Sequence, residues 1–239
     1  MSILSRATRV LAVTAAAAVV LLCAACSSGP SQDDSSSSGK ASSVATGTIG
    51  AAHLDDGYLS VGSGSTTVDT YIDPMCPYCG QFETANGRQL AQLVNDGTIT
   101  LRVHPLNFLD QISQGTAYSS RAANALTCVA AASPKQTLSY LGSLYAHQPH
   151  ENSPGLTDKQ LVSLSADVGA ASITRCVKMQ TYVPWVTKIT DAALNGPIKG
   201  ADITKIKGTP TVLVNGHSYA GSITDTAALK SIIEAGGQS

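Results

Sequence analysis

The fold of this chain is decided by residues 66–82, TTVDTYIDPMCPYCGQF. Residues 66–72 are rich in threonine, tyrosine and β-branched apolar residues, which favour a β-strand. After the two cysteines, apolar residues recur at helical spacing, and Asn-Asp-Gly at residues 95–97 is a stop signal. The apolar face of this helix consists of Phe82, Ala85, Leu90, Leu93 and Val94. The pattern predicts a strand, a turn with two cysteines, and a helix that begins near the first cysteine.

Cys76 and Cys79 enclose Pro77 and Tyr78 at the start of the predicted helix. The unpaired N–H groups and the positive end of the helix dipole favour a thiolate, so Cys76 is expected to be acidic and nucleophilic. Cys79 lies three residues later on the same side, where it can resolve a mixed disulfide formed at Cys76. Pro77 suits the first turn, because its missing N–H costs nothing there. The motif predicts a dithiol that exchanges disulfides.

Two other interpretations of the Cys-x-x-Cys pattern are open at this point: half of a zinc site, or a structural disulfide. A zinc site needs two further ligands. His147 and His150, three residues apart, are the pair that could be argued, and no second Cys-x-x-Cys follows. We therefore expect no metal and no other cofactor.

The sequence resembles the DsbA-like family of the thioredoxin superfamily in two motifs, DPMCPYC at residues 73–79 and GTPTVLVNG at residues 208–216. The similarity covers about residues 59–234. It implies an α/β, thioredoxin-like fold with a helical insertion. It also implies a protein thiol-disulfide oxidoreductase in which Cys76 and Cys79 are catalytic.

The resemblance also implies where a substrate binds. Thr209 and Pro210 match the family's cis-proline turn, which lies beside the dithiol and pairs through its backbone with an extended substrate segment. Pro77 and Tyr78, between the two cysteines, are expected to contact the substrate as well. Met75 is expected to border the same peptide groove.

One departure from the family pattern concerns proton transfer. Members with a strongly oxidising dithiol often carry a buried acid six residues before the first cysteine, and here that residue is Thr70. Asp69 and Asp73 are close in sequence but lie at different phases of the strand. The residue that handles the proton of Cys79 is therefore not predicted. His104 is expected in the core or at its rim rather than in the site.

The other two cysteines of the domain fall in a long stretch rich in alanine and leucine, about residues 116–195. This stretch resembles the helical insertion of the DsbA-like proteins. Cys128 and Cys176 lie on separate helical segments within it, and we expect them to form a structural disulfide with each other. The alternative is two buried free thiols, because cysteine packs well in cores.

The N-terminus has the pattern of a lipoprotein signal peptide. Arg6 and Arg9 precede an uncharged run that is too short to span a membrane. The segment Cys23-Ala-Ala-Cys26 resembles a bacterial lipobox, with Cys23 where leucine is usual. Residues 1–25 are predicted to be removed, and Cys26 is predicted to be lipidated. The alternative is ordinary secretion with a free thiol at Cys26.

The domain boundaries follow from composition. Residues 26–53 are dominated by serine, glycine and other small residues, which predicts a flexible tether. Residues 54–239 are assigned to the thioredoxin-like domain. Without residues 1–25, which hold two bases and no acid, 13 bases and 16 acids remain. A chain with this charge is not expected to bind nucleic acid.

These observations predict a membrane-tethered oxidase on the extracytoplasmic face of the bacterial cell membrane. It is expected to introduce disulfides into exported or cell-envelope proteins. The resemblance implies reoxidation by a membrane quinone-linked thiol oxidase, of the DsbB or vitamin-K-epoxide-reductase type. Two alternatives remain: a disulfide reductase or isomerase, and a non-catalytic holdase that binds peptides. The Pro77-Tyr78 dipeptide leaves the redox potential open.

Overall fold

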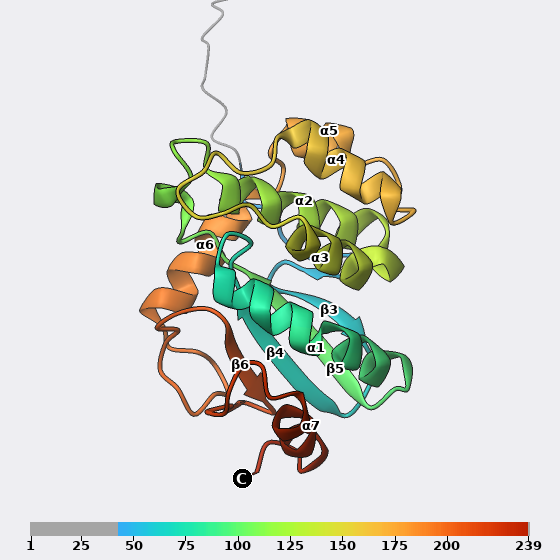
Figure 1. The fold of residues 1–239 in the computed structure, drawn as a ribbon, viewed down its shortest axis with the longest axis vertical. Helices are drawn as coiled ribbons and strands as arrows, with labels where there is room; N and C mark the ends of the chain where they lie inside the picture. The colour runs from blue at the N-terminus through green and yellow to red at the C-terminus, as the bar shows by residue number, and fades with distance from the viewer. Residues whose placement is uncertain (1–42, 239) are drawn as a thin grey trace, which may run out of the picture. The chain divides into compact units, whose positions relative to one another are not determined.

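The computed structural model describes residues 43–238, so the predicted signal peptide and Cys26 lie outside the described residues. Within them, the strands form one mixed sheet in the order β1-β2-β3-β5-β4-β6-β7 (Figure 1). The strands are β1 (Thr48–Ile49), β2 (Ala52–His53), β3 (Tyr58–Gly62), β4 (Thr66–Ile72), β5 (Ile99–Pro105), β6 (Thr211–Val214) and β7 (His217–Ser218). The α-helices are α1 (Pro77–Asn95), α2 (Tyr118–Ala132), α3 (Thr137–Ala146), α4 (Asp158–Asp167), α5 (Thr174–Lys178), α6 (Val183–Asn195) and α7 (Thr226–Glu234), with short 3-10 turns at Asp110–Ile112 and Pro134–Gln136.

The predicted strand and helix around the cysteines are observed. β4 runs parallel to β5 on one side and antiparallel to β6 on the other, so it is an interior strand of the sheet. Successive side chains of a strand point to opposite faces. Val68 and Thr70 therefore share one face of β4, whereas Asp69 and Tyr71 share the other. The predicted α/β, thioredoxin-like fold is confirmed.

Helices cover both faces of the sheet. α1 packs against β3 and β5 with α7 beside it, and Figure 1 shows α1 crossing in front of β4 and β5. α6 also packs against β5, and its residue Ile189 lines a cavity together with Tyr71. α6 therefore lies on the face of the sheet to which Asp69 and Tyr71 point.

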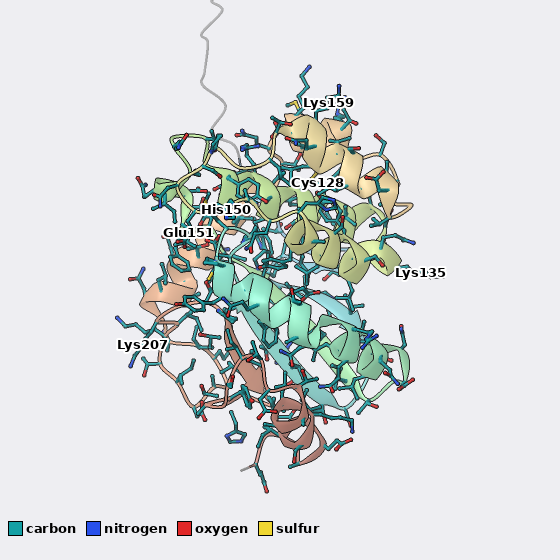
Figure 2. All side chains as sticks on the ribbon, viewed as in Figure 1. Cys128, Lys135, His150, Glu151, Lys159 and Lys207 are labelled. Atoms are coloured by element: carbon teal, nitrogen blue, oxygen red, sulfur yellow. A yellow bond between two sulfur atoms is a disulfide. The ribbon has the colours of Figure 1, made fainter. Side chains whose placement is uncertain are left out.

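The predicted insertion contains α2 to α6. The helices α2 to α5 gather at one end of the described domain, opposite α7 (Figure 1). α2 is buried along almost its whole length, which its small alanine side chains allow. A disulfide joins Cys128 of α2 to Cys176 of α5, with their Cα atoms 6.0 Å apart (Figure 2).

The boundary between tether and domain at residue 54 is wrong. Residues 48–53 form β1 and β2, which extend the edge of the sheet beyond β3. Ala51 donates its N–H to Ala130 of α2, at 2.9 Å, and is buried. The composition of this segment resembles a linker because Gly50, Ala51 and Ala52 are small, and these small residues allow its backbone to approach α2. A side chain at Gly50 would collide with the backbone of α2.

Among residues 43–238, no helix is both long and apolar enough to cross a membrane.

We expect the Cys128–Cys176 disulfide to be the main covalent support of the insertion. It closes a loop of 48 residues, so replacing both cysteines by alanine should lower the free energy of unfolding by about 4 kcal/mol in the chain-entropy description. Urea unfolding measures the loss. The matched control is Cys76→Ala with Cys79→Ala, which leaves this bond intact. Equal stability of the two double variants would contradict the expectation.

Candidate active site

The two cysteines of the Cys-Pro-Tyr-Cys motif have very different environments. Cys76 is the N-cap of α1, with an extended backbone, and Pro77 is the first helical residue. The N–H groups of Cys79 and Gly80 donate to the carbonyl of Cys76, at 3.0 and 3.2 Å. Cys79 is fully buried, whereas Pro77 and Tyr78 are exposed, Tyr78 to 60%. The turn therefore presents its middle residues to solvent and keeps Cys79 beneath them.

These environments separate the acidities of the two free thiols. The pKa of Cys76 is lowered to about 6, first because the Cys79 thiol donates to its sulfur. Burial opposes this effect, while Thr209 and the backbone N–H groups of Cys79 and Tyr78 lower the pKa further. The pKa of Cys79 is raised well above its ordinary value, mainly by burial and then by its bond to Cys76. The arrangement can hold a thiolate on Cys76 while the proton stays on Cys79.

Thr209 and Pro210 lie directly beside this pair. The Thr209–Pro210 peptide bond is cis, as the resemblance implies. The Cys76 thiol donates to the carbonyl of Thr209 at 3.2 Å. The hydroxyl of Thr209 is buried and has no hydrogen-bond partner among the described residues, so it is available to the Cys76 sulfur when that sulfur is ionised.

The turn before Cys76 is held by Asp73. Its fully buried carboxyl group accepts hydrogen bonds from the N–H of Met75 at 2.9 Å, the N–H of Leu109 at 3.0 Å and the hydroxyl of Ser119 at 2.5 Å. Burial nevertheless raises the pKa of Asp73 to about 7, against the effect of these three donors. An Asp followed by Pro at a strand end is a turn signal, so the sequence carried a local hint of this role.

Gln148, immediately after α3, was not predicted to belong to the site. Its side-chain amide donates to the carbonyls of Pro74 at 3.0 Å and Cys76 at 2.9 Å. A Cβ atom added at residue 80 would lie only 2.3 Å from the Oε1 of Gln148. The contact therefore requires glycine at this position. The contact spans 72 residues of sequence to Cys76, and no local pattern could reveal it.

The expectation for Met75 is wrong. Its side chain is fully buried, because the hydrogen bond from its N–H to Asp73 folds the turn back on the core. His104 does lie in the core, 8% exposed, and its ring bonds to Asp69 rather than to the dithiol turn. Thr70 is buried and uncharged.

Two buried acids with raised pKa values flank the dithiol in the sequence. One is Asp73, and the other is Glu83, one helical turn after Cys79. Burial raises the pKa of Glu83 to about 7. Its carboxylate lies over Gly87, where any side chain would collide with it. The charges of Cys79, Asp73 and Glu83 all act on Tyr145, whose pKa is raised by burial first and then by these groups.

A groove of about 460 Å³ adjoins the dithiol. It runs along the start of α1 and is bounded by the end of α3 and the loop before α7. Its lining residues carry no formal charge. They are Pro77, Gly80, Gln81, Thr84, Ala85, Tyr145, Gln148 and Thr224.

In the described part of the chain, no group of three or more histidine, cysteine or acidic side chains is arranged to hold a metal ion.

Comparison with known proteins agrees with this geometry. The family model described as Thioredoxin matches residues 61–235. The chain belongs to the thioredoxin family. The reduced disulfide-bond oxidoreductase DsbG of Mycobacterium tuberculosis is 27% identical, with a TM-score of 0.64 over 76% of this chain and 88% of that one. Reduced DsbA of the same species is 26% identical, with a TM-score of 0.65 over 77% and 93% of the two chains.

A curated relative is the serine/threonine-protein kinase PknE of Mycobacterium tuberculosis. It is 38% identical over 132 residues, which are 52% of this chain and only 23% of the kinase. Within the family, the structural matches identify this protein as a DsbA-like thiol-disulfide oxidoreductase.

The acidity of Cys76 leads to a pH prediction. Iodoacetamide should alkylate Cys76 of the reduced protein with a midpoint near pH 6. Because this pKa is depressed by folding, the ionised thiol stabilises the reduced protein fully above the ordinary thiol pKa of about 8.5, and this stabilisation is lost as the pH falls through the folded value. Thr209→Val should shift the midpoint upward. A wild-type midpoint at the ordinary thiol value would contradict the proposed hydrogen bonding.

Gln148 and Gly80 should show energetic coupling. Gln148→Leu removes the two bonds to the turn and should cost about 1–3 kcal/mol of unfolding free energy, because the Pro74 carbonyl loses its partner. Gly80→Ala should displace the same amide, so the double variant should lose less than the sum of the single losses. Gly142→Ala is the matched control, since a Cβ there makes only ordinary contact. Additive losses in urea unfolding would show that the contact is unimportant.

Proposed function

We propose that this oxidoreductase works as an oxidase that introduces disulfides into exported or cell-envelope proteins. The observation that carries the proposal is the unequal acidity of Cys76 and Cys79 at the start of α1. A stabilised thiolate favours the reduced dithiol, and a disulfide whose reduced form is stable is a good acceptor of electrons. The low pKa also makes Cys76 a good leaving group.

The oxidising cycle begins with a disulfide between Cys76 and Cys79. A substrate thiolate attacks the sulfur of Cys76, the bond between the two cysteines breaks, and the sulfur of Cys79 takes up a proton. A second substrate thiolate then attacks the substrate sulfur of the mixed disulfide and releases Cys76 as a thiolate. The substrate loses two electrons and gains a disulfide, and the enzyme is left with a reduced dithiol.

The neighbourhood of Cys76 suits an extended peptide. The backbone of Thr209, before the cis-proline, lies 3.2 Å from the Cys76 sulfur and can pair with a substrate backbone. Pro77 and Tyr78 provide an exposed surface beside it. The adjoining groove is uncharged and lined by small side chains, two amides and one tyrosine. We therefore propose Thr209, Pro210, Pro77 and Tyr78 as the substrate-binding residues and a polar, uncharged segment as the preferred neighbour of the reacting cysteine.

The proposed location rests on the sequence. Residues 1–25 have the pattern of a signal peptide, and Cys26 would be acylated, which would tether the domain to the extracytoplasmic face of the bacterial membrane. A domain held there can reach exported substrates. It can also reach a membrane quinone-linked oxidase, of the DsbB or vitamin-K-epoxide-reductase type, which would restore the Cys76–Cys79 disulfide.

A redox titration against glutathione tests the direction of the reaction. A Cys76 pKa of about 6 lies between the values of thioredoxin, about 7, and DsbA, about 3.5. We expect a reduction potential between theirs, clearly more oxidising than the about −270 mV of thioredoxin. Mass after thiol alkylation reports both cysteine pairs together. A potential at or below that of thioredoxin would instead support a reductase.

Trapping separates an enzyme from a holdase. With reduced, unfolded ribonuclease as the substrate, the wild type should form disulfides in it and the Cys76→Ser variant should form none. The Cys79→Ser variant should accumulate mixed disulfides through Cys76 when a disulfide-containing substrate is supplied, because nothing resolves them. Peptide binding that persists without any turnover in the wild type would favour the holdase.

A further inference from the structure

A second cavity lies away from the dithiol, between the sheet and α6. Its volume is about 390 Å³, within the range of about 300–1,000 Å³ that is common for small-molecule sites. Strand residues of β3, β4 and β5 line one side, and α6 with residues 197–201 lines the other. The thiol chemistry described above uses none of these residues.

Charged groups are buried at the sheet side of this cavity. Asp69 is 5% exposed and accepts hydrogen bonds from Arg102 at 2.6 Å and from the ring of His104 at 2.9 Å. Buried ion pairs seldom stabilise a fold more than apolar residues of the same volume would. A polar cluster of this kind, beside a cavity, is therefore more readily explained by binding than by stability.

Two donors next to Asp69 have no partner. Tyr71 is 5% exposed and stacks on His104 with ring centroids 4.0 Å apart, and its hydroxyl bonds to no other described residue. Burial raises the pKa of Tyr71 to about 12, so the hydroxyl keeps its proton and can donate. The Nε of Arg102 is also buried without a partner in residues 43–238. Buried polar groups are nearly always hydrogen-bonded in native proteins, so the unpaired Arg102 nitrogen indicates a missing acceptor beside the cavity.

Three acids also line the cavity, and two of them accept hydrogen bonds. Asp55 accepts from the N–H of Gly47 at 3.0 Å, and Asp56 lies 3.8 Å from the ring of His53. Asp69 has the two partners described above.

The lysines at the cavity contrast with these acids. Lys188 of α6 and Lys199 both line the cavity, and neither forms an ion pair with any residue of the described domain. The donors at the cavity that have no described partner are thus a hydroxyl, a guanidinium nitrogen and two ammonium groups, whereas of the three acids only Asp56 makes no hydrogen bond.

We propose that this cavity is a binding site for a small amphipathic carboxylate, whose head group accepts from Tyr71 and Arg102. Lys188 and Lys199 compensate the charge of that head group. The body of the ligand packs against an apolar wall. The wall consists of Leu54, Ile189, Ala192, Ile198 and Leu213.

Octanoate is the probe, with octylamine and octan-1-ol as ligands of equal chain length and different head groups. Trp185 is the single tryptophan of the chain and donates its indole N–H to the carbonyl of Leu54 at 2.8 Å, so its fluorescence reports on the cavity wall. We expect a saturable change with octanoate on the full chain, matched by calorimetry. Octanol and octylamine should bind at least about tenfold more weakly, as expected for losing hydrogen bonds to a charged group.

Variants assign the effect to the cavity. Tyr71→Phe keeps the ring on His104 and should weaken octanoate binding about tenfold by removing one donor. The double variant Lys188→Gln, Lys199→Gln should also weaken octanoate binding. Both lysines are exposed, so replacing them should leave the fold intact. Lys159→Gln is the matched control, because Lys159 extends from α4 at the far end of the domain (Figure 2).

Three results would overturn the proposal: no saturable response to octanoate, octylamine binding as tightly as octanoate, or unchanged affinity in both the Tyr71 and the double lysine variants. None of them would affect the oxidase proposal, because Cys76 and Cys79 do not line this cavity.

Discussion

The structure depends on how the backbone is held between the end of β4 and the start of α1. Three residues separate Ile72 from Cys76, and in that distance the chain must leave a buried strand, turn and begin a helix. The carboxyl group of Asp73 and the amide of Gln148 satisfy the polar groups that this turn exposes. Because both contacts reach into the insertion or the loop before it, the helical insertion helps to fix the position of the dithiol.

The contrast between the two sulfurs follows from that fixed turn. Cys76 caps the helix, where N–H groups converge on it, and Cys79 is one turn deeper, where burial keeps it protonated. Helix geometry places the two sulfurs on one side of α1, and burial of Cys79 together with the contact of Cys76 to Thr209 adds to the asymmetry. The cis-proline turn completes the site from the other end of the domain. The reactive dithiol therefore depends on three segments: the start of α1, the helical insertion and the cis-proline turn. None of these segments could form the site alone.

Local patterns in the sequence were sufficient for β4, α1, β5 and the position of the dithiol, because strand and helix periods and turn residues are local properties. The resemblance supplied the cis-proline turn. Neither the local patterns nor the resemblance could predict contacts between segments that are distant in sequence. Gln148 contacts Cys76 across 72 residues, and Ser119 contacts Asp73 across 46. Composition misassigned residues 48–53, since the small residues at positions 50–52 suit both a linker and a backbone packed closely on a helix. Met75 was misplaced because a single hydrogen bond decides which way its turn folds.

The spacing of the cysteines has a consequence for the biogenesis of the protein itself. Four thiols in the domain can pair in three ways, yet two of them are separated by only two residues and the other two by 48 positions. Short loops close with the smallest entropic cost, so the nearby pair is engaged first and the distant pair is left to each other. Loop-closure entropy therefore favours the observed pairing over the two alternatives, which would both join distant cysteines across the domain.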